Sequence, residues 1–253
     1  MPETIKTDVC VIGAGSGGLS VAAGASQMGA KVVLVERGKM GGDCLNYGCI
    51  PSKALIAAAH TAQTIRTSDQ FGITVAEPMI NFAAVRDHVR GIIAAIEPKD
   101  SVERFTGLGV QVIEAEGKFL GPDALQAGDA RIEARRFVIA TGSAAMVPPI
   151  PGLADAPYLT KKTIFGLNKR PDHLIVVGSG HLGAELAQAH RRLGAKVTIL
   201  EMFNFLGKGD PALTTVIRRH DPRCRNRTQY YRISSNDYKS AIIPTELNRQ
   251  HGS

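Results

Sequence analysis

The sequence contains no run of about 18 or more consecutive apolar residues, the length that a helix needs to cross a membrane. The first residues show no signal-peptide pattern and lead directly into a predicted strand. No second pair of Cys or His residues at metal-ligand spacing accompanies Cys44 and Cys49. These absences predict a cytoplasmic protein with no membrane partner and no metal site.

The chain also lacks a basic helix interleaved with aromatic residues, although its net charge of +7 at first suggests a nucleic-acid partner. The segment 221–253 holds six basic and three acidic residues, so nearly half of the excess charge lies there. A mildly basic, solvated surface accounts for the charge, and we expect no nucleic-acid partner.

A chain of 253 residues, 44% of them hydrophobic, is long enough for one large domain or two smaller ones. What the sequence does contain is one pattern twice: an apolar strand, a glycine-rich turn, a helical run, a second strand and a carboxylate. Residues 7–12 and 174–177 open the two copies, and Glu36 and Glu201 close them. The repeat predicts an α/β fold with two Rossmann-like βαβ dinucleotide-binding units.

In the first copy, the turn contains Gly13, Gly15 and Gly18. Gly13 permits the tight turn, Gly15 lets the backbone approach a pyrophosphate, and Gly18 lets the helix pack close to the strand. N–H groups at the start of the helix bind phosphates, and Glu36 is placed to bond ribose hydroxyls. These residues predict a dinucleotide site.

The second copy repeats the first at a constant offset, with Gly178, Gly180 and Gly183 in its turn and Glu201 in the position of Glu36. A carboxylate at that position hydrogen-bonds a ribose 2′-OH and repels a 2′-phosphate. NAD is therefore expected at the second copy, and NADP is disfavoured. Two copies predict two bound nucleotides.

Cys44 and Cys49 lie between the first copy and an apolar helical run. Pro51 favours a helix that begins just before it, because the missing N–H of proline falls among groups that are unpaired in a first turn. Cys49 is therefore expected at a helix N-terminus, where negative charge is stabilised and a thiolate is reactive. The residues indicate a reactive cysteine pair, but the spacing is also compatible with half of a zinc site or a structural disulfide.

Residues 41–53 read Gly-Gly-Asp-Cys-Leu-Asn-Tyr-Gly-Cys-Ile-Pro-Ser-Lys. This segment resembles the redox-active disulfide signature of the class I pyridine nucleotide–disulfide oxidoreductases, flavoproteins that include dihydrolipoyl dehydrogenase, glutathione reductase and mercuric reductase. Asp43 departs from the family pattern, which usually has Thr there. The resemblance implies that Cys44 and Cys49 form a redox-active disulfide, that the first copy holds FAD and that the second holds NAD.

The resemblance also implies roles for other residues. Lys53 and Glu185 are expected to pair beside the flavin, where Lys53 stabilises negative charge on the reduced form. Thr141 and Gly142 resemble the family's strand-to-turn segment that returns the chain to the nucleotide. Gly117 falls where the family's backbone approaches the adenine side of FAD.

The function implied by the resemblance is that of a dihydrolipoyl dehydrogenase-like dithiol/disulfide oxidoreductase. A small dithiol such as that of lipoamide attacks the disulfide through Cys44, Cys49 faces the flavin, and electrons pass through FAD to NAD. A mercuric reductase-like enzyme and a non-catalytic nucleotide-binding remnant are the alternatives. Members of the family are homodimers.

These patterns divide the chain into a FAD-binding domain at 1–150, a partial NAD-binding domain at 151–219 and an atypical tail at 220–253. The tail is expected to be disordered or unrelated sequence, without regular structure. Short strands at 110–115, 117–120 and 131–140 are expected to form a small antiparallel meander in the first domain.

The resemblance ends at about Arg219, and the tail after it lacks apolar periodicity. No His in the chain is followed by Pro, whereas family chains continue into a dimerisation domain with a His-Pro segment. We therefore expect a truncated chain, with a frameshift or early stop as the hypothesis. Sequencing the locus tests it: an intact downstream frame encoding the missing half supports the hypothesis, and its absence contradicts it.

Overall fold

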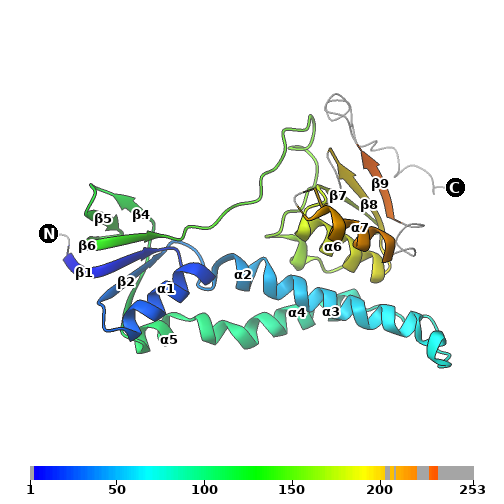
Figure 1. Cartoon of the computed structure of the whole chain (residues 1–253), viewed down its shortest axis with the longest axis horizontal. Helices are drawn as coiled ribbons and strands as arrows, with labels where there is room; N and C mark the ends of the chain where they lie inside the picture. The colour runs from blue at the N-terminus through cyan, green and yellow to red at the C-terminus, as the bar shows by residue number, and fades with distance from the viewer. Residues whose placement is uncertain (1–2, 203–205, 208, 221–227, 233–253) are drawn as a thin grey trace. The chain divides into compact units, whose positions relative to one another are not determined.

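The computed structural model describes residues 3–202, 206–207, 209–220 and 228–232. The chain forms two compact units, whose elements are labelled in Figure 1. The first unit contains residues 1–55 and 84–144, and the second contains residues 56–83 and 145–253. The domain division predicted from the sequence had assigned residues 56–83 to the first domain. Helices α3 (Cys49–Arg66) and α4 (Phe82–Ile96) each contribute residues to both units.

The first unit is built on a six-stranded sheet in the order β3-β2-β1-β6-β5-β4. Its parallel strands are β1 (Glu3–Ile12), β2 (Val32–Glu36), β3 (Val110–Glu114) and β6 (Ala130–Ile139). Side chains alternate between the two faces of a strand, so Val11 packs with helices α1 (Ser16–Gln27) and α5 (Val102–Gly107). This parallel, Rossmann-like arrangement confirms the fold class predicted from the sequence.

The antiparallel part of this sheet is formed by β4 (Gly117–Phe119), β5 (Ala124–Ala127) and the beginning of β6. The predicted meander is therefore present, but two of its details were wrong. Residues 110–114 form β3, parallel with β2, because Val110 is buried in the core that contains α5. Strand β5 was not predicted, and its Leu125 packs against Cys10 on the second face of the sheet.

The second unit contains a parallel sheet in the order β7-β8-β9. Its elements are η1 (Ser68–Phe71), η3 (Ile164–Gly166), β7 (His173–Val177), α6 (His181–Arg192), β8 (Lys196–Glu201), α7 (Pro211–His220) and β9 (Thr228–Arg232). Ala187 of α6 packs against Val197 and Ile199, which connects the helix to the sheet. Strand β9 lies in segment 220–253, for which the sequence predicted no regular structure. Residues 221–227 and 233–253 lie outside the described part of the chain.

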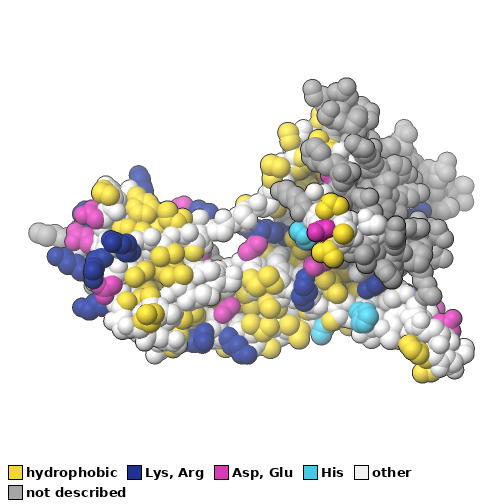
Figure 2. Space-filling view, in the orientation of Figure 1, with side chains coloured by type: hydrophobic (Ala, Val, Ile, Leu, Met, Phe, Trp, Pro, Cys, Tyr) yellow, Lys and Arg dark blue, Asp and Glu magenta, His cyan; other side chains and the backbone are white. Residues whose placement is uncertain are grey.

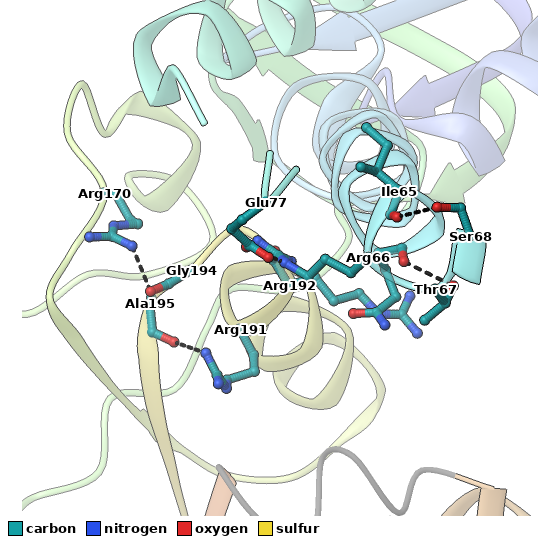
Figure 3. A network of polar contacts seen from close by, with 11 residues as sticks. Ile65, Arg66, Thr67, Ser68, Glu77, Arg170, Arg191, Arg192, Gly194 and Ala195 are labelled. Atoms are coloured by element: carbon teal, nitrogen blue, oxygen red, sulfur yellow. Dashed lines mark hydrogen bonds and ion pairs between the residues drawn. The ribbon is translucent and has the colours of Figure 1, made fainter. Parts of the chain in front are cut away.

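Arginine side chains from three parts of the second unit bind backbone carbonyl groups at the C-terminal end of α6 (Figure 3). The guanidinium groups of Arg66, Arg170 and Arg191 donate to the carbonyl oxygens of Arg192, Gly194 and Ala195, respectively. Carbonyl groups at a helix C-terminus lack intrahelical partners and carry partial negative charge, so cationic donors stabilise this end of α6.

On the face of the first unit seen in Figure 2, lysine and arginine side chains are interspersed with acidic ones. Arg37 pairs with Glu116, and Arg135 pairs with Asp8. A hydrogen bond from the Lys31 N–H, followed by one from Arg135, lowers the pKa of the Asp8 carboxyl.

None of the helices within the described residues has the length and hydropathy of a membrane span.

Candidate nucleotide and redox site

The first glycine turn begins where β1 ends, beside the end of β6. Gly13 N donates to Val35 O at 2.8 Å, and Gly13 has a φ of +105°, which glycine adopts without strain. A Cβ at Gly13 would lie 2.3 Å from Ala140 O and 3.2 Å from Thr141 Cα. The structure therefore brings Thr141 to the turn, with Gly142 next in the chain, and both residues are exposed.

Glu36 ends β2, and its carboxylate reaches back to the same turn. Oε2 accepts a hydrogen bond from Ala14 N at 2.6 Å, and Oε1 accepts one from Gly38 N at 2.6 Å. These two backbone donors fix the carboxylate at the C-terminal edge of the sheet, where dinucleotide folds place a ribose.

Helix α1 fits a phosphate group at its N-terminus. Gly15 is the N-cap, no side chain caps the helix, and its first turn contains no acidic residue. The first N–H groups of a helix have no intrahelical partners and favour an anion. A Cβ at Gly17 would meet no atom within 4 Å, whereas one at Gly18 would overlap Gly13 O. The turn is thus open on its outer side and close-packed on its inner side, as the pyrophosphate of a dinucleotide such as FAD requires.

The cysteine segment packs directly on this turn. Cys44 lies on a short helix, α2 (Gly42–Asn46). A Cβ at Gly42 would lie 2.6 Å from Gly15 Cα, and Gly41 forms an isolated bridge with Gly15. Asn46 Nδ2 donates to Met40 O at 3.0 Å, which ties the end of α2 to the residues before it. The close approach places the two predicted sites of the first unit side by side.

Cys49 is the first residue of α3, at the helix N-terminus predicted from Pro51. Ser52 is buried at 1% exposure, and its N–H donates to Gly48 O at 3.0 Å. Cys44 and Cys49 are both free thiols, with Cys44 half-buried and Cys49 exposed. Burial, reinforced by the hydrogen bond and charge interaction with Cys49, raises the pKa of Cys44 to about 11. Cys44 is therefore protonated at neutral pH in the reduced pair.

The second glycine turn repeats the geometry of the first. Gly178 has a φ of +98°, and its N–H donates to Leu200 O at 2.8 Å. Gly180 is the N-cap of α6, again without a side-chain cap, and a Cβ at Gly183 would lie 2.3 Å from Gly178 O. Glu201 ends β8, and its Oε2 accepts a hydrogen bond from Ser179 N at 2.7 Å. This turn therefore fits a second dinucleotide by the same criteria.

Three residues expected at the site do not belong to either glycine turn. Gly117 begins β4, where its closest side-chain neighbour is Leu125 of β5. Lys53 lies on the part of α3 that belongs to the first unit, and Glu185 lies on α6 of the second. The Lys53–Glu185 pair and the adenine contact of Gly117 stay predictions.

Sequence reasoning missed two contributors to the site. Gly42 was quoted within the family motif but received no role, although its contact with Gly15 joins the cysteine segment to the turn. Ser179 was passed over inside the second fingerprint, although its hydroxyl donates to Glu201 Oε2 at 2.6 Å. A comparison of the two copies could have indicated Ser179, because the equivalent residue of the first copy is Ala14, which has no hydroxyl.

Within the described part of the chain, no three His, Cys, Asp or Glu side chains are placed to hold a metal ion. The described candidate residues are glycine turns, carboxylates and thiols.

A family model described as pyridine nucleotide-disulphide oxidoreductase matches residues 7–246. The chain belongs to this family. The match extends into segment 220–253, beyond Arg219, where the sequence had predicted that the resemblance ends.

Two kinds of named oxidoreductase are similar to this member of the family. The mercuric reductase of Streptomyces lividans is 34% identical over 232 residues, which cover 88% of this chain and 49% of the reductase. The dihydrolipoyl dehydrogenase of Halobacterium salinarum is 35% identical over 206 residues, covering 78% of this chain and 43% of the dehydrogenase. The chain spans about half or less of the length of these curated relatives.

Proposed function

We propose that this chain is the nucleotide-binding and cysteine-bearing part of a dihydrolipoyl dehydrogenase-like flavoprotein. Such a flavoprotein would exchange electrons between a small dithiol and the pair Cys44–Cys49, with FAD held at the first turn and NAD at the second. The observation that carries the proposal is the packing of Gly42 on Gly15, which holds the cysteine segment against a turn that fits a dinucleotide.

The residues of the first turn would hold FAD. N–H groups at the start of α1 would bind the pyrophosphate, and Glu36, fixed by Ala14 N and Gly38 N, would accept hydrogen bonds from ribose hydroxyls. Lys53 would stabilise negative charge on the reduced cofactor, paired with Glu185. FAD, when bound, supplies a two-electron acceptor that also delivers hydride to a nicotinamide.

The thiol–disulfide exchange with the substrate can be written using only Cys44 and Cys49 of this chain. A substrate thiolate attacks Cys44 Sγ, the Cys44–Cys49 bond breaks, and Cys49 leaves as a thiolate at the N-terminus of α3, where negative charge is favoured. The second substrate thiolate then attacks the mixed disulfide and releases the oxidised substrate. The pair has gained two electrons, and Cys44, whose pKa is raised to about 11, takes up a proton.

At the second turn we infer NAD rather than NADP. Glu201 lies where a carboxylate meets the ribose 2′-OH, and its Oε2 is held by Ser179 N. A 2′-phosphate at that position would face a like charge. A cytoplasmic location is part of the proposal as an expectation from the family.

The two turns allow a crossed binding experiment on the 253-residue chain. Glu36→Ala is expected to weaken FAD binding and leave NADH binding unchanged, and Glu201→Ala is expected to do the reverse. Equilibrium dialysis with each nucleotide measures both effects. A wild-type chain that binds neither FAD nor NADH would overturn the proposal.

A mercuric reductase-like function is the second candidate, since the Streptomyces lividans enzyme is similar over a larger share of this chain than the Halobacterium salinarum enzyme. NADH oxidation that depends on lipoamide supports the first function, and oxidation that depends on Hg(II) supports the second. A chain that binds nucleotides but supports neither reaction would be the non-catalytic remnant.

A further inference from the structure

Ser179 is fully buried in the second glycine turn, with 0% exposure. Its backbone N–H and its hydroxyl both donate to the same oxygen, Glu201 Oε2, at 2.7 and 2.6 Å. The same hydroxyl also lies 3.4 Å from Leu206 N, which donates to it from the segment after β8. One short side chain thus connects the turn, the carboxylate and the following loop.

The first turn has no such hydroxyl. Its equivalent residue is Ala14, also 0% exposed, and only the Ala14 N–H reaches Glu36 Oε2, at 2.6 Å. A glycine turn of this kind therefore folds around an alanine, and the Ser179 hydroxyl is an addition specific to the second turn. The hydroxyl contacts Glu201, the acidic residue that would hydrogen-bond the ribose.

We propose that Ser179 is a positioning residue that sets the coenzyme specificity of the second nucleotide site. Two donors on Oε2 hold the Glu201 carboxylate in one orientation, so it cannot turn away from a 2′-phosphate without breaking a hydrogen bond to a charged acceptor. A dinucleotide with a free ribose 2′-OH is accepted, and one with a 2′-phosphate is rejected. This inference rests on the proposed function, because it requires a nicotinamide dinucleotide at the second turn.

The test compares the dissociation constants of NADH and NADPH for the wild-type chain and for Ser179→Ala, by fluorescence titration. The preference for NADH over NADPH is expected to fall about tenfold in Ser179→Ala, the scale of losing one hydrogen bond to a charged group. Far-UV circular dichroism checks that the variant folds, as the alanine in the first turn leads us to expect.

The matched control is Ser68→Ala in the same unit. The Ser68 hydroxyl donates to backbone carbonyls of Ile65 and Ile73, at 2.9 and 2.8 Å, and has no part in the turn. Its loss should leave the NADH/NADPH ratio unchanged. A ratio that is unchanged in Ser179→Ala, or an equal loss of both coenzymes, would overturn the inference while leaving the proposed function intact. A wild-type chain that binds neither coenzyme would overturn both.

Discussion

Gly13 in the first unit and Gly178 in the second occupy equivalent places and have similar φ angles, +105° and +98°. Their surroundings differ. A Cβ at Gly13 would lie 2.3 Å from Ala140 O, whereas one at Gly178 would meet no atom within 4 Å. The difference arises because β1 lies between β2 and β6, while β7 is an edge strand of the described sheet.

Burial follows the same division. Cys10 and Val11 near the C-terminal end of β1 are 0% exposed, whereas the equivalent residues of β7, Ile175 and Val176, are only partly buried. The local motif therefore fixes the backbone of a βαβ unit, and the strands on either side decide how tightly it is held. Equal substitutions in the two turns should have unequal effects.

The largest contrast is expected between Gly13→Ala and Gly178→Ala. Both substitutions force a non-glycine residue into a positive-φ conformation, which costs about 1–3 kcal/mol. Gly13→Ala also pushes Cβ into a backbone carbonyl that cannot move without displacing β6, so its total cost should be about 3–5 kcal/mol. Urea unfolding followed by circular dichroism, with limited proteolysis to identify the unit that opens, measures both.

Gly17→Ala is the control, because its Cβ would meet no atom within 4 Å and Gly17 has no positive φ. It should leave the first unit as stable as the wild type or more stable. Equal losses for Gly13→Ala and Gly178→Ala would show that the contact with Ala140 does not matter.

The thiols provide a second contrast, because Cys44 and Cys49 both belong to the first unit. In the reduced protein, Cys44 is mostly neutral below its pKa of about 11, so its reaction with a disulfide reagent should speed up about tenfold per pH unit between pH 8 and 10. Cys49→Ser removes the neighbour that helps to raise this pKa, so Cys44 should react faster at pH 8 in that variant.

The measurement uses a Cys224→Ser background, because Cys224 lies outside the described residues. Cys10 is the internal control: it is 0% exposed, and burial raises its pKa to about 12. Two thiols should react in the native protein and a third only after unfolding. A Cys44 rate that does not change with pH would contradict the effect of burial.

Much of the first unit could be read from the sequence because the decisive signals are local. The apolar strand, Gly13, the helical run and Glu36 follow one another within a short stretch, and each element has its own pattern. Cys49 at the start of α3 was predicted for the same reason, since Pro51 marks a first turn. Because the second copy follows the first at a fixed offset, the second turn could be predicted as well as the first.

What the sequence did not reveal depends on partners that are distant in the chain. Residues 110–114 have the composition of any short strand, and only their contact with β2 makes them parallel rather than part of the meander. The role of Gly42 depends on Gly15, which lies on the other side of α1 and β2 in the chain. Strand β9 carries no apolar periodicity, and its pairing with β8 defines it.

His190 of α6 marks a smaller difference between the units, since the equivalent residue of α1 is Ala25. His190 is 1% exposed, its ring nitrogen Nδ1 lies 2.9 Å from Leu186 O, and no hydrogen-bond partner for Nε2 exists among the described residues. Burial lowers the pKa of His190, although the Leu186 carbonyl opposes this shift. The folded second unit therefore favours a neutral ring.

Because the unfolded chain binds a proton near pH 6.5 and the folded unit does not, the second unit should lose stability as the pH falls below about 6.5. Each unit by which the pKa is lowered corresponds to about 1.4 kcal/mol. His190→Phe should reduce this loss, whereas the exposed-residue variant His181→Gln should retain it. Urea unfolding at pH 5 and pH 8 tests both, and an unchanged pH dependence in His190→Phe would contradict the assignment.

The smallest contrast concerns the two helix C-termini. The last turn of α1 has no basic residue, whereas Arg170 Nη1 donates to Gly194 O at 2.6 Å just beyond α6. Arg170→Ala should cost the second unit about 0.5–1 kcal/mol, because an exposed cation at a helix C-terminus contributes no more than that. The loss should shrink at about 1 M salt, where charges are screened beyond about 3 Å. Lys169→Ala, next to it, is the control: thermal unfolding that moves equally in both variants would mean that net charge, and not the bond to Gly194, is responsible.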